Sequence, residues 1–311
     1  MSFGSQNPRP RGVPLGSLQE LLKPTSLKTS REGDSLVVRH ENLISRVEVT
    51  APANPELDAN KISAIVTIKT LLPKDVESLL GPPGMTISLN ILATLSALYR
   101  EQNGLYIGSR LTVYERDDAW NMQVPLLLLS IIAGVDTLLG GIRRVFSKES
   151  PKGGYSEWTE GDFDFIRSYL SRLSVCTGGG LGLSAEFGLK TGEFAAIGGH
   201  RNTALWEMSA EQPHPEMGGG LFCLLQLPYQ FSDQTKLDRI INELNNMEME
   251  PHDLPPHFGA WCRGRSNSNP AYVSFLPNAL HSVSGIGVNF SIWAMARAHW
   301  ADAMLITMGA R

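Results

Sequence analysis

The residues of this chain that could do chemistry are few and scattered. Seven histidines are present, and none lies in an HExxH pattern, the spacing that puts two zinc ligands on one face of a helix. The nearest cluster is His252-Asp253 with His257, in a proline-rich stretch. Solvated loop imidazoles account for this spacing more simply than a metal site does, so we expect no metal and no cofactor.

Nucleophilic catalysis has one weak candidate, Cys262. It lies beside Arg263, and a nearby cation lowers the pKa of a thiol; His257 is five residues away. If both residues lie on one strand, this odd spacing points them to opposite faces. The chain has no GxSxG motif and no CxxC motif. We therefore read its three cysteines (Cys176, Cys223 and Cys262) as small buried or partly buried thiols in a reducing compartment.

Phosphate binding and nucleic-acid binding are both disfavoured. The glycine-rich run from Thr177 to Gly182 is not followed by the Lys-Ser/Thr pair that a P-loop needs, and it reads as a connector. The net charge is −4, so no basic surplus argues for a phosphate backbone as a partner. We expect no nucleic acid among the partners.

Aromatic and basic side chains on the expected strands are stronger candidates, for a surface that binds a partner. Tyr, Trp and Arg suit protein interfaces because they combine apolar area with directed hydrogen bonds. Each also fits the alternative of a core residue on an alternating strand. The residues are Tyr106, Arg110, Tyr114 and Trp120 in the first part of the chain, and Phe258, Trp261, Arg263 and Tyr272 in the second.

The elements that position these residues occur twice. Residues 48–57 (EVTAPANPEL) resemble residues 207–217 (EMSAEQPHPEM), and a strand-like apolar run follows each. In this match His214 is aligned with Asn54, a polar loop residue, which favours a turn at both positions. A second match joins PLLLLS at 125–130 to PNALHS at 277–282 at a smaller offset. We assign the change of offset to extra loop residues around Gly81-Pro82-Pro83-Gly84.

Hydrophobic periodicity and turn residues predict the same order of elements in both copies, α-β-β-β-α-β-β-α. In the first copy we expect helices at 15–22 and 86–101 and one ending near 146, with strands at 35–40, 44–49, 62–70, 105–114 and 120–127. In the second copy we expect helices at 163–173 and 232–247 and one ending near 305, with strands at 183–187, 204–209, 221–227, 258–263 and 271–275.

This order predicts an α+β protein of two tandem domains with antiparallel sheets. We expect a disordered tail over 1–14, a first domain over 15–146, a polar linker over 147–160 and a second domain over 161–311. The apolar stretch at 124–142 approaches membrane-spanning length. Its counterpart at 276–300 carries polar and charged residues, so we expect no membrane insertion. The amino-terminal residues lack the apolar region of a secretory signal, and we expect a cytoplasmic protein.

The element order resembles that of the small α/β domains of bacterial type III secretion chaperones and of the related YbjN family. The resemblance is clearest at 237–264 (LDRIINELNNMEMEPHDLPPHFGAWCRG), with Asn242 and Asn245-Asn246 near the helix end, and at 271–278 (AYVSFLPN). It implies domains that bind protein segments, usually as dimers; here one chain would supply both halves of an intramolecular pseudo-dimer. The chain is longer and less acidic than such chaperones, which argues against a secretion effector as its client.

Together these features predict a non-catalytic protein-binding module, a chaperone, adaptor or inhibitor-like protein, whose partner is another protein. It would act as a monomeric pseudo-dimer or within a hetero-complex. One alternative is a structural subunit of a larger assembly, with exposed apolar helix faces such as Leu126–Leu139. The other is a hydrolase with a site between the copies, near His252, His257 and Cys262.

Overall fold

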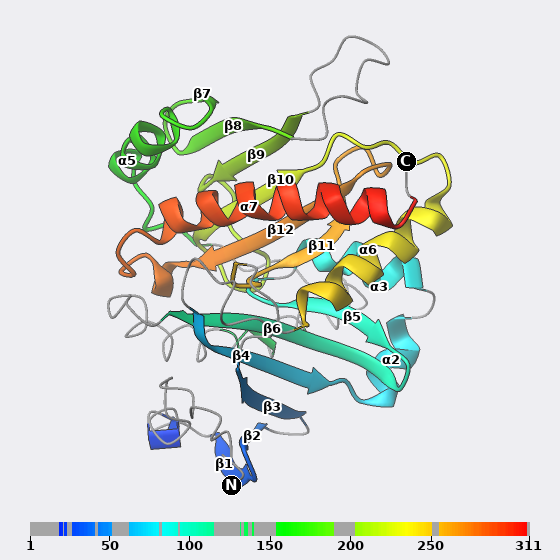
Figure 1. The fold of residues 1–311 in the computed structure, drawn as a ribbon. Coiled ribbons are helices and arrows are strands. Elements are labelled where there is room, and N and C mark those ends of the chain that lie inside the picture. Colours follow the sequence, from blue (N-terminus) through cyan, green and yellow to red (C-terminus); the bar gives the residue numbers. More distant parts are fainter. Residues whose placement is uncertain are drawn as a thin grey trace, which may run out of the picture.

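The computed structural model contains two six-stranded antiparallel sheets with the same strand order (Figure 1). It describes residues 19–20, 22–23, 27–40, 43–51, 62–80, 83–92, 94–114, 131, 134–135, 139, 154–189, 203–250 and 255–309. The strand order is β1-β2-β3-β4-β6-β5 in the first sheet and β7-β8-β9-β10-β12-β11 in the second, so the two orders correspond strand by strand. The α+β class and the duplication into two similar sheet units are thereby confirmed. We call the described residues up to 139 the first half and those from 154 the second half.

The first half consists of four strands, then short helices, then a hairpin whose two strands complete the sheet. Its elements are β1 (Lys28–Glu32), β2 (Ser35–His40), β3 (Leu43–Thr50), β4 (Ile62–Leu71), α2 (Lys74–Leu80), α3 (Pro83–Leu89), η1 (Asn90–Leu92), β5 (Ala97–Glu101) and β6 (Gly104–Tyr114). Ile131, Gly134, Val135 and Leu139 are helical, and the three apolar ones are buried, as the helix expected before residue 146 requires.

The second half repeats this plan with longer helices. Its elements are α5 (Glu160–Leu170), β7 (Val175–Thr177), β8 (Gly182–Gly188), β9 (Thr203–Ser209), β10 (Gly220–Gln226), α6 (Gln234–Glu248), β11 (Ala260–Arg263), β12 (Pro270–Pro277), η3 (Asn278–Leu280) and α7 (Ile286–Thr307). Thr159 begins α5 with a capping box, and Asp233 accepts the first free amides of α6. Thr and Asp are both residue types that favour the start of a helix.

One predicted helix, 86–101, is wrong beyond its first turn. The spacing of apolar residues from 87 to 98 fits a helix, but α3 ends at Leu89 and residues 97–101 form β5, which pairs with β6. Gln102 and Asn103 form the turn between these strands, and Gly104 begins β6. Asn and Gly are common in turns, and here the turn and the pairing with β6 outweigh the helical spacing.

The predicted order also lacks one strand per half. β1 and β7 precede the three predicted strands, so each sheet has four strands before its helices and two after them. Both missed strands lie at a sheet edge and are mostly exposed, so they carry no apolar alternation to reveal them. The glycine-rich run after Thr177 connects β7 to β8. The predicted strand at 120–127 and the tail over 1–14 lie outside the described residues.

The described part of the segment does not support the explanation that we gave for the change of offset. The first half has two short helices here, α2 ending at Leu80 and α3 beginning at Pro83, whereas the equivalent α6 is continuous. Equivalent strand starts, Ala97 in β5 and Ala260 in β11, are further apart than Glu48 and Glu207. The difference in residue number between equivalent positions of the two copies therefore grows after the helices. It decreases again only between β6 and Ile131, a stretch that lies mostly outside the described residues.

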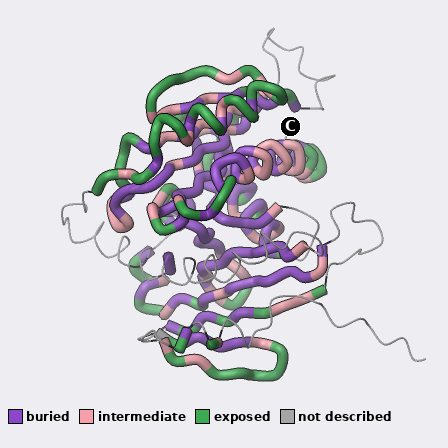
Figure 2. Tube along the Cα trace, turned by 90° about the vertical axis from the view of Figure 1, so that its left-hand side faces the viewer, coloured by how far each residue is buried: buried purple, intermediate pink, exposed green. Residues whose placement is uncertain are grey.

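The largest hydrophobic cluster spans both halves. It contains Leu36, Val47 and Leu111 from the first half and Trp206 and Leu225 from the second. A second, smaller cluster lies within the first half. Buried residues concentrate toward the middle of the molecule and exposed ones toward its outer ends (Figure 2). No helix among the described residues is long and apolar enough to cross a membrane.

The carboxyl-terminal part of the predicted linker is tied to the second half. The Ser156 hydroxyl donates to the carbonyl of Gly220 at 2.9 Å, and the Asn278 amide donates to the carbonyl of Tyr155 at 2.8 Å. Trp158 is buried in the core and meets the His281 ring edge-on. Residues 147–153 lie outside the described part of the chain.

Candidate functional site at the junction of the two halves

The two halves are joined by main-chain hydrogen bonds at equivalent positions. His257, three residues before β11, exchanges two bonds with Arg110 on β6: its N–H donates to the Arg110 carbonyl at 2.7 Å, and its carbonyl accepts from Arg110 at 3.3 Å. Thr94, three residues before β5, accepts from the N–H of Phe275 on β12 at 3.0 Å. The first residue of β5 pairs with Gly108 of β6, and the first residue of β11 pairs with Val273 of β12. Arg110 and Phe275 each lie two residues further along, so they are equivalent. Each half therefore extends the ladder of the other.

Asparagine side chains close the inner sheet edges. The amide of Asn90 accepts from the N–H of Leu98 at 2.8 Å and donates to its carbonyl at 2.9 Å. Asn245 makes the same pair of bonds to Trp261, at 2.8 and 3.0 Å. Leu98 and Trp261 are the second residues of β5 and β11, so the two pairs of bonds are equivalent. We call these two side-chain pairs of bonds, from Asn90 and from Asn245, the asparagine clamps. Asn90 also donates to the Trp261 carbonyl at 3.1 Å, across the junction.

Helices of each half also contact a strand of the other half across the same junction. The helix α6 of the second half lies against β5, and α3 of the first half lies against β11 (Figure 1). On β5, the N–H of Arg100 donates to Asn242 at 3.0 Å, and its carbonyl accepts from Asn242 and Asn246. The fourth residues of β5 and β11 also match, since Arg100 pairs with Glu77 and Arg263 pairs with Asp238.

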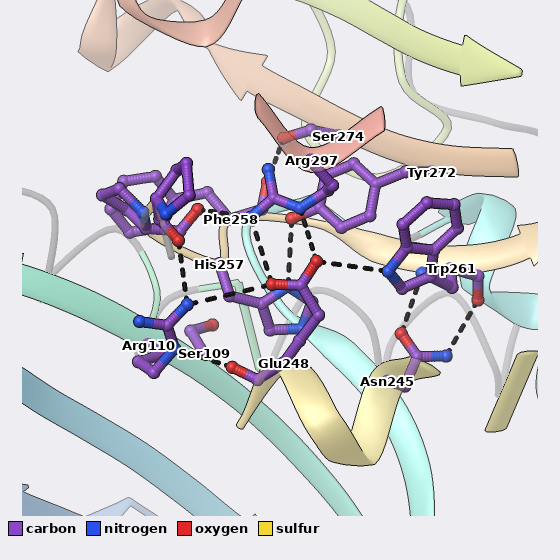
Figure 3. Close-up of polar contacts among 12 residues, drawn as sticks. Ser109, Arg110, Asn245, Glu248, His257, Phe258, Trp261, Tyr272, Ser274 and Arg297 are labelled. Atoms are coloured by element: carbon purple, nitrogen blue, oxygen red, sulfur yellow. Dashed lines mark hydrogen bonds and ion pairs between the residues drawn. The ribbon is translucent and has the colours of Figure 1, made fainter. Parts of the chain in front are cut away.

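A buried charge cluster occupies one side of this junction (Figure 3). Glu248, the last residue of α6, accepts from Arg297 of α7 at 2.5 and 3.2 Å and from the Trp261 indole at 3.2 Å. A guanidinium nitrogen of Arg110 lies 3.9 Å from the same carboxylate, and His257 Nδ1 lies 3.6 Å from it. The side chains of Glu248, Arg110 and His257 are fully buried.

Main-chain carbonyls and one ring complete the cluster. Arg110 donates to the carbonyl of Glu248 at 2.7 Å and to that of Pro255 at 2.9 Å, and Arg297 donates to that of Pro256 at 2.8 Å. The guanidinium of Arg297 lies 4.2 Å from the ring centre of Tyr272, a cation–π contact. One carboxylate thus faces two guanidiniums. The excess positive charge is offset by carbonyl dipoles, including one at the negative end of α6.

The pKa shifts follow from this arrangement. Burial opposes ionisation of Glu248, yet Arg297, His257 and Arg110 lower its pKa to about 2. Burial lowers the pKa of Arg110 to about 10, partly countered by Glu248. Burial also opposes the charge on Arg297, but Glu248 and Tyr272 raise its pKa above the usual value. All three groups are therefore charged at neutral pH, and the cluster is an ion network tying α6, α7 and β6 together.

The equivalent position on the other side of the junction is uncharged. Where the cluster has Arg110 and His257, this side has Phe275 and Thr94, and the ring of His214 lies 4.9 Å from that of Phe275. His214 Nδ1 accepts from the N–H groups of Glu216 and Met217, so Nε2 donates to the Leu92 carbonyl at 2.9 Å. Burial lowers the pKa of His214, which favours this neutral form. His214 thus lies in a turn, as the sequence indicated, and also bridges the halves.

The structure separates the residues of the predicted Cys–His site. Cys262 lies in a small apolar core with Leu224 and Val273, and burial raises the pKa of its thiol to about 12. The ring of His257 faces Glu248 and the Tyr272 hydroxyl instead. His252 lies outside the described residues. Among the residues that are described, no three His, Cys, Asp or Glu side chains gather as metal ligands would.

The predicted partner-binding residues lie mostly inside the molecule. Arg110, Phe258, Trp261 and Tyr272 are buried, so these four offer no surface to a partner in this structure. Tyr106 is partly buried and stacks with Tyr99 toward the second half. Tyr114 packs partly against the main core, Arg263 pairs with Asp238, and Trp120 lies outside the described residues. The four buried members of the set lie at the junction rather than on the outer surface.

Sequence reasoning missed Glu248 and Arg297, as well as the two clamping asparagines. A usable signal was present. The runs Ala97-Leu-Tyr-Arg100 and Ala260-Trp-Cys-Arg263 match. Aligning the copies on these runs would have located β5. No pattern of spacing reveals Glu248 and Arg297, because their contact joins elements far apart in the chain.

No protein-family model, curated protein or solved structure matches this chain.

Proposed function

We propose that the chain is a non-catalytic protein-binding module built as an intramolecular pseudo-dimer. The equivalent contacts that cross the junction support the pseudo-dimer: the Arg110–His257 and Phe275–Thr94 ladders, and the packing of α6 and α3 against β5 and β11. The resemblance to secretion chaperones and YbjN-type domains implies the same assembly from two separate chains. In this chain the usual dimer interface is internal, so the partner binds elsewhere.

The distribution of exposed apolar side chains carries the proposal of a protein partner. Leu71, Leu79, Met85 and Ile91 are all exposed and lie within a short stretch at the end of β4, in α2 and α3, and in η1. Large apolar side chains gathered in one exposed segment are typical of interaction sites. We call residues 71–80 and 83–91 the helical surface and assign the partner to it. An apolar segment of another protein is the ligand that this chemistry suits.

The test is affinity capture from the native host with identification of the bound proteins other than the chain itself. The wild type is compared with the double variant Leu79→Ser/Ile91→Ser, and with Ile44→Ser as a control at an equally exposed position on β3. We expect one stoichiometric partner, retained by the control and reduced about tenfold or more by the double variant. No stoichiometric partner, or one that all variants bind equally, would refute the proposal.

A further inference from the structure

The histidine on the uncharged side of the junction is held in one protonation state by its neighbours. His214 is buried in the turn between β9 and β10. Its Nδ1 accepts from the main-chain N–H groups of Glu216 and Met217 at 3.1 and 3.2 Å. Nε2 then carries the ring proton and donates it to the Leu92 carbonyl of the first half at 2.9 Å. A neutral ring satisfies all three bonds.

A second proton on this ring would conflict with the turn that holds it. It would change Nδ1 from an acceptor into a donor, and two N–H groups already point at that nitrogen. The turn itself is fixed, because His214 and Gly218 exchange two main-chain bonds, at 2.7 and 2.9 Å. A side chain at Gly219 would overlap the Tyr155 carbonyl, so the chain is tightly packed there. The ring therefore has to move, and its movement breaks the bond to Leu92.

The surroundings of the ring favour its neutral form. Burial lowers the pKa of His214 below its ordinary value of 6.5, against the opposing effects of the Leu92 carbonyl and the Glu216 carboxylate. Glu216, on the same turn, is the charged group that acts on the ring among the described residues; β12 presents the apolar ring of Phe275. The contribution of the neutral ring to stability is thus present above about pH 6.5 and lost as the pH falls below it.

The contact to Leu92 supports the ladder on the same side of the junction. Two residues further along, the Thr94 carbonyl accepts from the N–H of Phe275 at 3.0 Å and from the hydroxyl of Ser274 at 3.2 Å. The ring of Phe275 also lies against the ring of His214, with 4.9 Å between their centres. Movement of the histidine therefore disturbs both strands of this contact, the segment from Leu92 to Thr94 and the end of β12.

We propose that His214 is a proton-sensitive latch, which opens the uncharged side of the junction in mild acid while the ion network holds the other side closed. The latch consists of the His214 ring, its turn and the Leu92 carbonyl. The ion network is built around Glu248 (Figure 3), a carboxylate that stays ionised far below the pH at which a histidine gains its proton. Because the two sides respond to different ranges of pH, opening is confined to one side.

Hydrogen–deuterium exchange of the full-length chain tests this opening. Rates are measured at pH 7 and at about pH 5, and each is divided by the intrinsic rate at that pH. The amides of Phe275, Glu216 and Met217 should lose protection about tenfold or more at the lower pH. The amides of Arg110 and His257, at the equivalent ladder on the other side, should keep theirs.

His214→Asn separates the latch from other titrating groups. Its side-chain oxygen can still accept from the turn, but the shorter side chain does not reach Leu92 and does not titrate in this range. Protection at Phe275 should then be low at both pH values and equal. His281→Asn is the matched control, because His281 bonds to Asp162 away from the ladder; it should keep the wild-type response. Circular dichroism and thermal unfolding at pH 7 check that both variants fold.

A second measurement follows the ring in the wild-type chain and does not depend on any variant folding. Nuclear magnetic resonance of histidine rings labelled with carbon-13 and nitrogen-15 reports both the tautomer and the charge. The ring of His214 should carry its proton on Nε2 at pH 7. It should gain a second proton below about pH 6.5, over the range in which Phe275 loses protection.

Four results would overturn the proposal. The ring of His214 could stay neutral down to about pH 4.5, or it could gain a proton while Phe275 stays protected. Exchange could rise equally on both sides of the junction, or His214→Asn could keep the wild-type response to pH. None of these results bears on the proposed function, because that is measured by capture of a partner through the helical surface.

Discussion

At the residue scale, the most unusual feature is a fully buried carboxylate held between two arginines. Removing two charges from water is costly, and a buried ion pair is not by itself evidence of stability. Losing one partner is a different matter, because the other charges then remain buried without compensation. Glu248 is the only carboxylate facing Arg297 and Arg110 among the described residues, so the network depends on it.

Glu248→Gln should therefore destabilise the fold by about 3–5 kcal/mol, measured by urea unfolding at pH 7. Glu250→Gln is the matched control, because Glu250 is an exposed acid two residues further along. The pKa of Glu248 is lowered to about 2 from an ordinary value of 4.5. Its ionic contribution is then present above about pH 4.5 and lost as the pH falls toward 2. The free energies of unfolding of the wild type and of Glu248→Gln, measured as a function of pH, should converge over that range. A difference that stays constant with pH would contradict the ionic explanation.

At the scale of elements, the asparagine clamps make the main-chain hydrogen bonds that an additional strand would otherwise make. β5 and β11 are edge strands with main-chain groups directed away from the sheet, and side-chain amides from η1 and α6 satisfy them. A buried main-chain group left without a partner costs roughly 1–3 kcal/mol. The clamps therefore stabilise each half and protect its inner edge from pairing with other chains.

Asn90→Ala and Asn245→Ala should each lower the free energy of unfolding by about 2 kcal/mol or more, because each removes the side-chain bonds to one main-chain N–H and one carbonyl. The Trp261 carbonyl keeps its bond from Asn90 when Asn245 is replaced. Asn289→Ala on α7, away from both edges, is the control. Both asparagines donate to the Trp261 carbonyl, so the double variant should depart from additivity. Urea unfolding of the three variants and the double variant measures these effects. Full additivity would mean that the two clamps act independently.

At the scale of the whole molecule, the halves share the largest hydrophobic cluster and form main-chain hydrogen bonds with each other across the junction. A chain of this length usually divides into domains with separate cores. Here the same apolar cluster contains residues of both sheets, so neither sheet retains a complete core without the other.

The whole chain should consequently unfold in a single cooperative transition. Differential scanning calorimetry should give a calorimetric enthalpy equal to the van 't Hoff enthalpy. Glu248→Gln should move this transition to lower temperature without dividing it. Two resolved transitions, with Glu248→Gln shifting only one of them, would show that the halves are stable separately.

Much of the fold could be predicted from the sequence because it depends on local patterns. Alternating residues define β3, side-chain caps begin α5 and α6, and the repeated segments at 48 and 207 reveal the duplication. The failures occurred where two local signals competed, as at β5, or where an edge strand carried no apolar pattern, as at β1 and β7. In both cases pairing with a neighbouring strand decided the structure.

The sequence by itself thus determined the class of fold, the duplication and the small number of residues fit for chemistry. Only the tertiary structure decided that Arg110, Trp261 and Tyr272 face inward, that Glu248 meets Arg297, and that His214 bridges the halves. The physical reason is that periodicity fixes which residues share a face of an element. What covers that face depends on contacts between segments far apart in the chain.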